Sequence, residues 1–311
     1  MTQTALVNKI IPFSSVDGPG NRTAIFLQGC NINCRYCHNP ETRAVCISCG
    51  TCVAQCPAGA LSLTADGRVS WDPAKCVQCD TCIHVCPHNA SPRVIRMTPE
   101  EVMKKVERQI PFIRGISVSG GECMLHPDFL TELFTIAKKT DAGAGLPLTT
   151  LIDSNGTIDF RQNPALMQVS DGVMLDIKAF DSEDHRRITD APNETVLENA
   201  RWLAEHERLY EIRCVIAPHL YDVRKSVQGA GEFLLPLYLK QLEKEAAGDY
   251  RQKKKDPKAV GIFRPFRFKL IACRPMGVRP AYSGFAQPGS ALMQELSDLL
   301  KAMGYRDIVV I

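Results

Sequence analysis

The sequence predicts an α/β fold, either a β/α barrel or a doubly wound sheet, interrupted by a cysteine-rich insert. From Met97 onward, short apolar runs alternate with segments of helical length, as in parallel strands joined by helices. About six strand–helix units can be counted outside the insert, which is too few for a closed barrel of eight. The insert, residues 41–96, has a different pattern, because one cysteine word occurs twice within it.

The individual elements follow from local signals. The apolar run Thr23–Leu27 predicts the first strand, and Thr98 followed by Pro99 predicts the cap and first turn of a helix that ends near Gln109. A short hairpin is expected around Asp66-Gly67, a common turn dipeptide. Further strands are expected at 115–119, 148–152, 172–176, 211–216 and 267–272, and further helices at 128–139, 194–207, 223–245 and 290–303.

Composition narrows the class of protein. The chain has 311 residues, of which 45% are hydrophobic and 23% charged, as in an ordinary globular protein of one large domain with an insert, or two domains. A net charge of +3 gives no reason to expect nucleic acid or a membrane surface as a partner. The N-terminal segment lacks the apolar core of a signal peptide. Of the 14 cysteines, three lie in one motif and eight in the insert, so we expect a reducing, cytoplasmic and anaerobic setting.

Cys30, Cys34 and Cys37 form a C-x3-C-x2-C motif directly after the first expected strand. Closely spaced thiolates on such a loop can hold a four-iron cluster. Three ligands leave one iron open for an exogenous ligand, as catalytic metal sites do. The alternatives are a structural zinc site or a disulfide loop. Zinc would require a fourth ligand, and His38 is too close to Cys37 to serve well.

The insert contains the word C-x2-C-x2-C-x3-C-P twice, which is the pattern of bacterial two-cluster ferredoxins. In that pattern the fourth cysteine of each word ligates the other cluster. One predicted four-iron cluster is therefore held by Cys46, Cys49, Cys52 and Cys86, and the second by Cys76, Cys79, Cys82 and Cys56. Zinc knuckles are the alternative, but they do not explain the repeated word.

Polar residues follow the expected strands at the edge where barrels of this class place their chemistry. Gly120 and Gly121 would let the backbone approach a ligand, and Glu122 could accept from an ammonium group, although a tight turn gives the same pattern. Asp153 begins a polar Asp-Ser-Asn-Gly word that could equally be a simple turn.

Asp176 and Lys178 lie two apart at the end of a strand and therefore face the same side. Charges pointing into a barrel are costly unless they are paired or used, so an internal salt bridge is the alternative to a binding role. Asp153 and Asp176 would present two carboxylates to one pocket, and their mutual repulsion favours a bound cation between them. Arg213 is a further charge within an apolar strand.

The words GPG, FLQGC and CHNP around the first motif resemble the activating enzymes of glycyl radical enzymes, a family within the radical S-adenosylmethionine (SAM) superfamily. The resemblance extends over essentially the whole chain. It implies a partial (β/α)6 TIM-like barrel formed by residues 1–40 and 97–311, with residues 41–96 as a ferredoxin-like insert. The implied cofactors are three [4Fe-4S] clusters, SAM and a monovalent cation.

The same resemblance implies roles for particular residues. In the family the amino and carboxylate groups of SAM chelate the open iron, the glycine-rich motif meets the amino group and the lysine of the D-x-K pair meets the carboxylate. Tyr36 and His38, which flank Cys37, are further candidates for cofactor binding. Arg213 would hold the 5′-deoxyadenosyl group or the incoming peptide, with a core salt bridge as its alternative. Arg274 stands where the family often has a histidine that contacts SAM.

The activity implied by the resemblance is reductive cleavage of SAM to a 5′-deoxyadenosyl radical, which takes a hydrogen atom from a glycine of a partner enzyme. The implied partners are a glycyl radical enzyme and an electron donor of the flavodoxin or ferredoxin type. Two alternatives are a radical SAM enzyme that acts on a small molecule or RNA, and an electron-transfer protein. The small net charge argues against RNA, and electron transfer alone leaves the Asp176–Lys178 pair unexplained.

Overall fold

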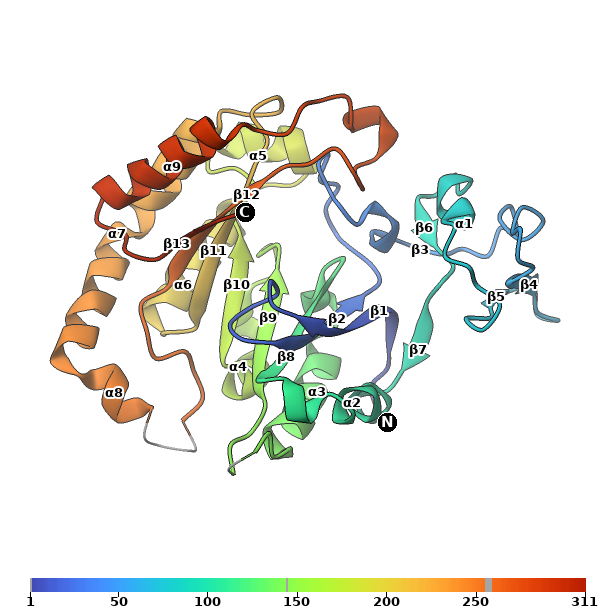
Figure 1. The fold of residues 1–311 in the computed structure, drawn as a ribbon, viewed down its shortest axis with the longest axis horizontal. Coiled ribbons are helices and arrows are strands. Elements are labelled where there is room, and N and C mark those ends of the chain that lie inside the picture. The colour runs from blue at the N-terminus through green and yellow to red at the C-terminus, as the bar shows by residue number, and fades with distance from the viewer. Residues whose placement is uncertain (1, 144, 255–258) are drawn as a thin grey trace.

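One sheet of nine strands forms the centre of the molecule (Figure 1). The computed structural model describes residues 2–143, 145–254 and 259–311. Strands follow one another across the sheet in the order β13–β12–β11–β10–β9–β8–β2–β1–β7. The two edge strands of this order do not pair with each other in the described structure, so the sheet is open. The strands are β1 (Ala5–Ser14), β2 (Arg22–Leu27), β7 (Ile95–Met97), β8 (Gly115–Gly120), β9 (Thr149–Ser154), β10 (Gly172–Asp176), β11 (Leu209–Ile216), β12 (Arg267–Ala272) and β13 (Ile308–Val310).

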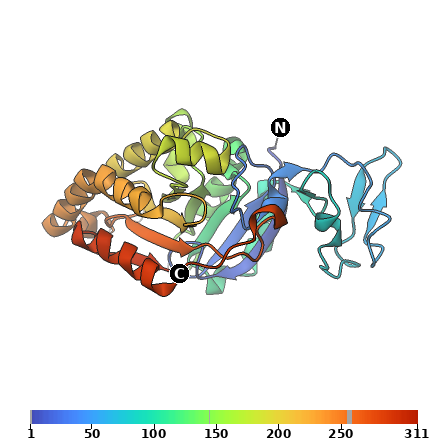
Figure 2. The ribbon, with the colours of Figure 1, turned by 90° about the horizontal axis from the view of Figure 1, so that it is seen from above.

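Within this sheet the neighbouring strands β2, β8, β9, β10, β11, β12 and β13 run parallel, whereas β1 is antiparallel to both β2 and β7. Helices connect the parallel strands, and α6, α7 and α9 lie together along the outside of the curved sheet (Figures 1 and 2). This arrangement brings the carboxyl ends of the parallel strands to a single edge. The helices of this part are α2 (Pro99–Glu107), α3 (Pro127–Lys139), α4 (Pro164–Val169), α5 (Ser182–Thr189), α6 (Glu194–Glu205), α7 (Val223–Ala247), α8 (Asp249–Lys253) and α9 (Ser290–Ala302).

The two faces of the sheet differ in chemistry, as β11 illustrates. Ile212 and Cys214 belong to the apolar core under the helices, together with Leu270 of β12. Since successive side chains of a strand point to opposite faces, Glu211 and Arg213 point the other way, into the concave side of the sheet. Both are buried there. The concave side is therefore polar. Its buried charged side chains must be paired, because an unpaired buried charge is costly.

Residues 40–94, which follow the Cys30–Cys37 loop and lead into β7, form a separate lobe that projects from the sheet (Figures 1 and 2). Its hairpin pairs Leu61 with Trp71 around Asp66-Gly67, as predicted. Gln28, at the end of β2, is buried, and its Nε2 donates to the carbonyl oxygens of Glu41 (2.6 Å) and Ala44 (2.7 Å), which fixes the chain at the start of the lobe. The elements are a 3-10 turn η1 (Pro40–Thr42), β3 (Ala44–Val45), β4 (Leu61–Leu63), β5 (Val69–Trp71), α1 (Thr81–His84) and β6 (Ala90–Ser91).

The predicted mixed α/β fold with a large parallel sheet is confirmed, and every predicted strand and helix is present within a few residues of its expected ends. Thr98 caps α2 through a hydrogen bond from the Glu101 amide, and the Glu101 side chain reciprocates. The prediction missed β1, because register shifts near Val7 and Ile11 break its alternation. No described helix is long and apolar enough to cross a membrane.

Candidate active site

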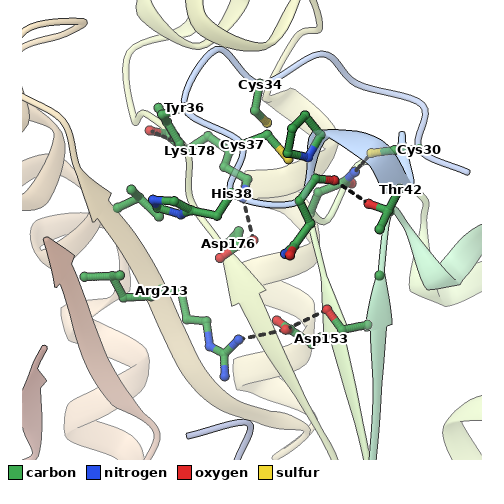
Figure 3. Close-up of a pocket in the computed structure, with 18 of the residues that line it drawn as sticks. Cys30, Cys34, Tyr36, Cys37, His38, Thr42, Asp153, Asp176, Lys178 and Arg213 are labelled. Carbon is green, nitrogen blue, oxygen red and sulfur yellow. Dashed lines mark hydrogen bonds and ion pairs between the residues drawn. The ribbon is translucent and has the colours of Figure 1, made fainter. Parts of the chain in front are cut away.

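A cavity of about 400 Å³ lies at the carboxyl ends of the parallel strands (Figure 3). Its volume falls within the range of pockets that hold small molecules. All the residues predicted for the site outside the insert line this cavity, with Glu122 as the one exception. Those residues are Cys30, Cys34, Tyr36, Cys37, His38, Gly120, Gly121, Asp153, Asp176, Lys178, Arg213 and Arg274.

The cysteine loop is held by backbone hydrogen bonds on both sides. The Cys30 amide donates to the Arg43 carbonyl (2.9 Å), and the Arg35 amide donates to the Ile188 carbonyl at the end of α5 (2.9 Å). Burial raises the pKa of the Cys34 thiol to about 12, although Lys178 acts in the opposite direction. A thiol in this position becomes a thiolate when a metal coordinates it. Three thiols from one rigid loop, all at one cavity, fit a three-cysteine iron–sulfur cluster.

The two glycines after β8 are required by backbone packing. A Cβ on Gly121 would lie 2.0 Å from the Gly29 carbonyl oxygen, and one on Gly120 would lie 2.1 Å from the Leu27 carbonyl oxygen. The close approach allows the Gly121 amide to donate to Leu27 O (2.9 Å) and the Glu122 amide to Gly29 O (2.7 Å). These glycines therefore join the end of β8 to the root of the cysteine loop, in addition to lining the cavity.

Glu122 lies behind the cavity wall, where it has internal partners. Its Oε1 accepts from the Met124 amide (2.9 Å) and the Ser154 hydroxyl (2.9 Å), and its Oε2 accepts from the Asn155 amide (2.7 Å). Burial raises the pKa of this carboxyl to about 7, and the three hydrogen bonds oppose that effect. The structure thus places Glu122 as a support of the loops after β8 and β9, away from a ligand in the cavity.

Asp176 and Lys178 form an ion pair at the end of β10, with 2.6 Å between Oδ2 and Nζ. Lys178 Nζ also lies 5.9 Å from the centre of the Tyr36 ring, whose hydroxyl donates to the Lys178 carbonyl (3.3 Å). Burial disfavours the charged lysine, but Asp176 outweighs it and the pKa of Lys178 is raised. The lysine therefore stays charged at the cavity wall, beside the cysteine loop.

Arg213 links two carboxylates on the concave side of the sheet. Its Nη1 contacts Asp153 Oδ2 at 2.8 Å, and its Nε contacts Glu211 Oε1 at 2.7 Å (Figure 3 shows the Asp153 contact). Glu211 also pairs with Arg267 Nη2 (2.7 Å), and the Ser119 hydroxyl donates to Asp153 (2.9 Å). Arg213 thus forms the buried salt bridge considered as its alternative role, and it lines the cavity as well.

The same contacts bear on the predicted cation. Asp153 is paired with Arg213, and Asp176 is paired with Lys178, so each carboxylate already has a cationic side chain. A monovalent cation is therefore not needed to offset their charge in this arrangement.

His38 and Arg274 come together from distant parts of the chain. His38 Nε2 lies 3.0 Å from the Arg274 carbonyl oxygen, and burial lowers the pKa of the imidazole. Arg274 is exposed to solvent and also lines the cavity. Nearby, Arg279 Nη2 donates to the Cys34 carbonyl (3.0 Å), which joins the loop after β12 to the cysteine loop.

Three residues that were not predicted for the site, Asn155, Lys269 and Arg279, also line the cavity. Asn155 Nδ2 lies 3.8 Å from Cys30 Sγ. Lys269 is buried on β12, where its Nζ donates to the Val16 carbonyl (2.8 Å) across the concave side. A lysine between the apolar residues Phe268 and Leu270 was the available signal for Lys269, of the same kind that identified Arg213.

The cysteines of the insert surround two small cavities. One is lined by Cys46, Cys49, Cys52 and Cys86, and the other by Cys56, Cys76, Cys79 and Cys82. Within residues 2–143, 145–254 and 259–311, no three Cys, His, Asp or Glu side chains converge closely enough for a single metal ion. The cysteines instead stand around a space in fours, which suits a cluster whose irons each take one ligand.

The two halves of the insert repeat the same left-handed backbone positions within their cysteine words. Left-handed φ angles occur at Ser48 (59°) and Gln78 (56°), and again at Gly50 (79°) and Asp80 (60°), always 30 positions apart. The hydrogen bonds to sulfur repeat in the same way: the Ala60 amide donates to Cys56 (3.3 Å) and the Ala90 amide to Cys86 (3.5 Å). The repeat in sequence is therefore also a repeat in structure.

Comparison with known proteins agrees with this geometry. The family model of the radical SAM superfamily matches residues 24–223, which include the cysteine loop and the ends of β8 to β11. The chain belongs to the radical SAM superfamily.

Among curated relatives of this radical SAM protein, an indoleacetate decarboxylase activating enzyme from Tractidigestivibacter scatoligenes is 34% identical over 98% of this chain and 97% of its own. A pyruvate formate-lyase-activating enzyme from Streptococcus mutans is 31% identical over 75% of this chain and 73% of its own. A choline trimethylamine-lyase activating enzyme from Oleidesulfovibrio alaskensis is 30% identical over 75% and 78%, respectively. The predicted family is confirmed, and this chain is a radical SAM oxidoreductase of the type that activates glycyl radical enzymes.

Solved structures show the radical SAM fold only. A radical SAM methyltransferase from Sphaerobacter thermophilus gives a TM-score of 0.53 at 12% identity, over 93% of this chain and 66% of that chain. Streptococcus suis SuiB bound to the precursor peptide SuiA gives 0.52 at 11% identity, over 91% and 47%.

Proposed function

We propose that the cavity at the strand ends binds SAM beside a four-iron cluster held by Cys30, Cys34 and Cys37, and that residues 41–96 carry two further clusters. The observation that carries the proposal is convergence: the three-cysteine loop, the Asp176–Lys178 pair and the Asp153–Arg213 pair all meet at one cavity. A cluster held by these three cysteines would supply the single electron needed for reductive cleavage of SAM, and the radical that results would take the α-hydrogen of a glycine in a protein partner.

The residues of the cavity have separate tasks in this proposal. Lys178 offers a fixed positive charge to the carboxylate of SAM, because Asp176 holds its ammonium group in place and keeps it charged. Gly120 and Gly121 bring backbone close to the ligand, while Glu122 holds the loop after β9 from behind the cavity wall by accepting from the Asn155 amide. His38 and Arg274 border the same cavity.

Arg213 has a positioning role, since its guanidinium is committed to Asp153 and Glu211. It holds Asp153 at the cavity wall, where the carboxylate faces the ligand. This interpretation joins the two roles considered for Arg213, because the buried salt bridge is what fixes the carboxylate.

The insert fits two [4Fe-4S] clusters on the swapped pattern, with Cys86 and Cys56 each serving the cavity of the other half. The support is the division of the eight cysteines between two cavities and the repeated backbone around them. Residues 1–40 and 97–311 would then form the partial barrel. The insert would receive electrons from a flavodoxin- or ferredoxin-type donor in a reducing, cytoplasmic setting, and the partner would be a glycyl radical enzyme.

The test is an anaerobic assay for 5′-deoxyadenosine with SAM and a strong chemical reductant, with and without a candidate glycyl radical enzyme. The proposal predicts SAM cleavage in both cases and a glycyl radical signal in electron paramagnetic resonance (EPR) spectra of the partner. Cleavage that modifies a small molecule or RNA, with no radical on any candidate partner, would contradict the protein substrate. Reversible reduction without SAM cleavage would reduce the chain to an electron carrier.

A further inference from the structure

The two halves of the insert differ in some side chains at corresponding positions. One such difference lies beside a single cavity. In the first half, Gly50 lies against Leu63, since a Cβ on the glycine would be 3.7 Å from Leu63 Cδ1. Thirty positions later, the same two places are occupied by Asp80 and Arg93. These form an ion pair with 2.5 Å between Oδ1 and Nη2. An apolar contact in one half is thus replaced by a fixed charge pair in the other.

Arg93 and Trp71 both face the cavity lined by Cys56, Cys76, Cys79 and Cys82. The Trp71 Nε1 atom is buried and has no hydrogen-bond partner among the described residues. An orphaned buried donor is costly, and an acceptor within the cavity would satisfy it. The sulfur atoms of an iron–sulfur cluster are such acceptors.

The cavity lined by Cys46, Cys49, Cys52 and Cys86 has a different wall. Ile47, Val69 and Pro92 make it mostly apolar, and Thr51 and the exposed His88 are its polar members besides the cysteines. It contains neither an arginine nor an indole N–H. The two cavities therefore offer similar cysteine ligands, but only the cavity lined by Cys56, Cys76, Cys79 and Cys82 has in its wall a guanidinium, paired with Asp80, and an indole N–H.

We propose that Arg93 and Trp71 make the two insert clusters unequal, so that the one held by Cys56, Cys76, Cys79 and Cys82 has the higher reduction potential. This inference rests on the proposed function, which places clusters in both cavities. Reduction adds one electron, taken from a low-potential one-electron donor, and no bond forms or breaks. A nearby guanidinium and N–H donors to sulfur stabilise the added negative charge. The electron therefore occupies this side of the insert first.

The experiment is an EPR-monitored redox titration at pH 8.5, above the ordinary range of histidine titration. The full chain is used with Cys30, Cys34 and Cys37 replaced by alanine, so that only the insert clusters titrate. Two midpoints are expected. Arg93→Gln should lower the higher one by about 59 mV or more, a tenfold change in the ratio of reduced to oxidised cluster for one electron. Trp71→Phe, which keeps an aromatic ring but removes the N–H, should move the same midpoint in the same direction.

Arg68→Gln is the matched control, because it removes the same unit charge from the insert. Arg68 pairs with Asp66 on the exposed hairpin and lines neither cavity. It should leave both midpoints nearly unchanged. The reverse exchange, Gly50→Asp with Leu63→Arg, should raise the lower midpoint, since Asp80 already tolerates the left-handed conformation that Gly50 has.

Two results would overturn the inference while leaving the proposed function intact: a single shared midpoint in the unmodified insert, or equal shifts for Arg93→Gln and Arg68→Gln. Iron content separates these from failure of the proposed function itself. About eight irons in the triple-alanine chain are required for two clusters. A content near zero or four would overturn both proposals together.

Discussion

The cavity of the sheet and the cavities of the insert are both surrounded by cysteines, but they are built in opposite ways. The sheet offers three cysteines from one loop and completes its site with side chains from β9 to β12. The insert offers two sets of four cysteines, which come from its two C-x2-C-x2-C-x3-C-P motifs. Few charged side chains line its cavities. Three ligands leave a position for a substrate, whereas four do not. In the proposed function, SAM cleavage therefore belongs to the sheet, and electron storage or transfer belongs to the insert.

The two regions also treat charge differently. In the sheet the charged residues are buried and paired, as Arg213 with Asp153 and Glu211. A buried pair is costly to break, since the remaining charge loses its partner. In the insert the Asp66–Arg68 pair is exposed, and such pairs contribute little. Substitutions should therefore have large, specific effects in the sheet and local effects in the insert.

The largest expected effect separates the two regions directly. Cys34→Ala removes one of three ligands, so SAM cleavage should be abolished with any reductant. Cys49 and Cys79 belong to the insert. The variants Cys49→Ala and Cys79→Ala should therefore still cleave SAM when a strong chemical reductant is supplied. Activation of a partner by a physiological donor should fall in both insert variants. The measurement is 5′-deoxyadenosine formed per enzyme under anaerobic conditions.

Iron analysis of each cysteine variant is the necessary control, because ligation and folding are coupled. With the remaining clusters loaded, loss of cleavage in Cys49→Ala or Cys79→Ala under strong reductant would mean that the insert takes part in the SAM step. Full partner activation in those variants would make the insert dispensable.

Gly121→Ala tests how the sheet supports the cysteine loop. The new Cβ would lie 2.0 Å from the Gly29 carbonyl, so β8 and the loop must separate. We expect loss of the cluster in the sheet and a marked fall in the thermal midpoint, with the insert clusters retained. Gly284→Ala is the matched control, because no atom lies within 4 Å of the added Cβ. A fully loaded, stable Gly121→Ala protein would contradict the described contact.

Lys178→Ala should weaken SAM binding roughly ten- to a hundredfold, since hydrogen bonds to charged groups contribute about 1.5–3 kcal/mol. The thermal midpoint should fall as well, because Asp176 loses its partner. Binding is measured by equilibrium dialysis with the loaded enzyme. Lys225→Ala, which breaks an exposed pair with Asp181, should change neither quantity much. Lowered stability with unchanged affinity for SAM would assign Lys178 a purely structural role.

The smallest effect is a change in pH dependence at Glu122. Burial raises the pKa of this carboxyl from its usual 4.5 to about 7. The folded state then binds more protons than the unfolded state, so the stability contributed by the neutral form is present below pH 4.5 and is lost as pH rises to about 7.

Glu122→Gln cannot ionise, so thermal midpoints of the variant should lack this decline between pH 4.5 and 7. The variant should also be less stable at low pH, because one carboxylate oxygen that accepts a backbone N–H becomes an amide donor. Parallel pH profiles for the variant and the unmodified chain would show that Glu122 does not titrate in this range.

The insert could be predicted from the sequence more fully than the cavity of the sheet. The insert could be predicted because its cysteine ligands lie within two short sequence motifs and because the β4–β5 hairpin has a local turn signal. The cavity of the sheet could be predicted only in part. Asp176 and Lys178 stand out as charges at a strand end, but the partnership of Lys269 with Val16 joins residues 253 positions apart. For Glu122 the sequence predicted a contact with the ligand. Its three internal hydrogen bonds could not be predicted, because they depend on the packing of β8 against β9.

The most direct test of the account is the iron and zinc content of the anaerobically reconstituted chain, measured beside that of the Cys30, Cys34 and Cys37 triple-alanine variant. Three clusters require about twelve irons in the unmodified chain and about eight in the variant, since the insert keeps its two sets of four ligands. EPR of the reduced samples should show loss of the SAM-sensitive signal in the variant and retention of the other signals. A chain that binds about four irons together with zinc, and loses all its iron in the variant, would contradict the account.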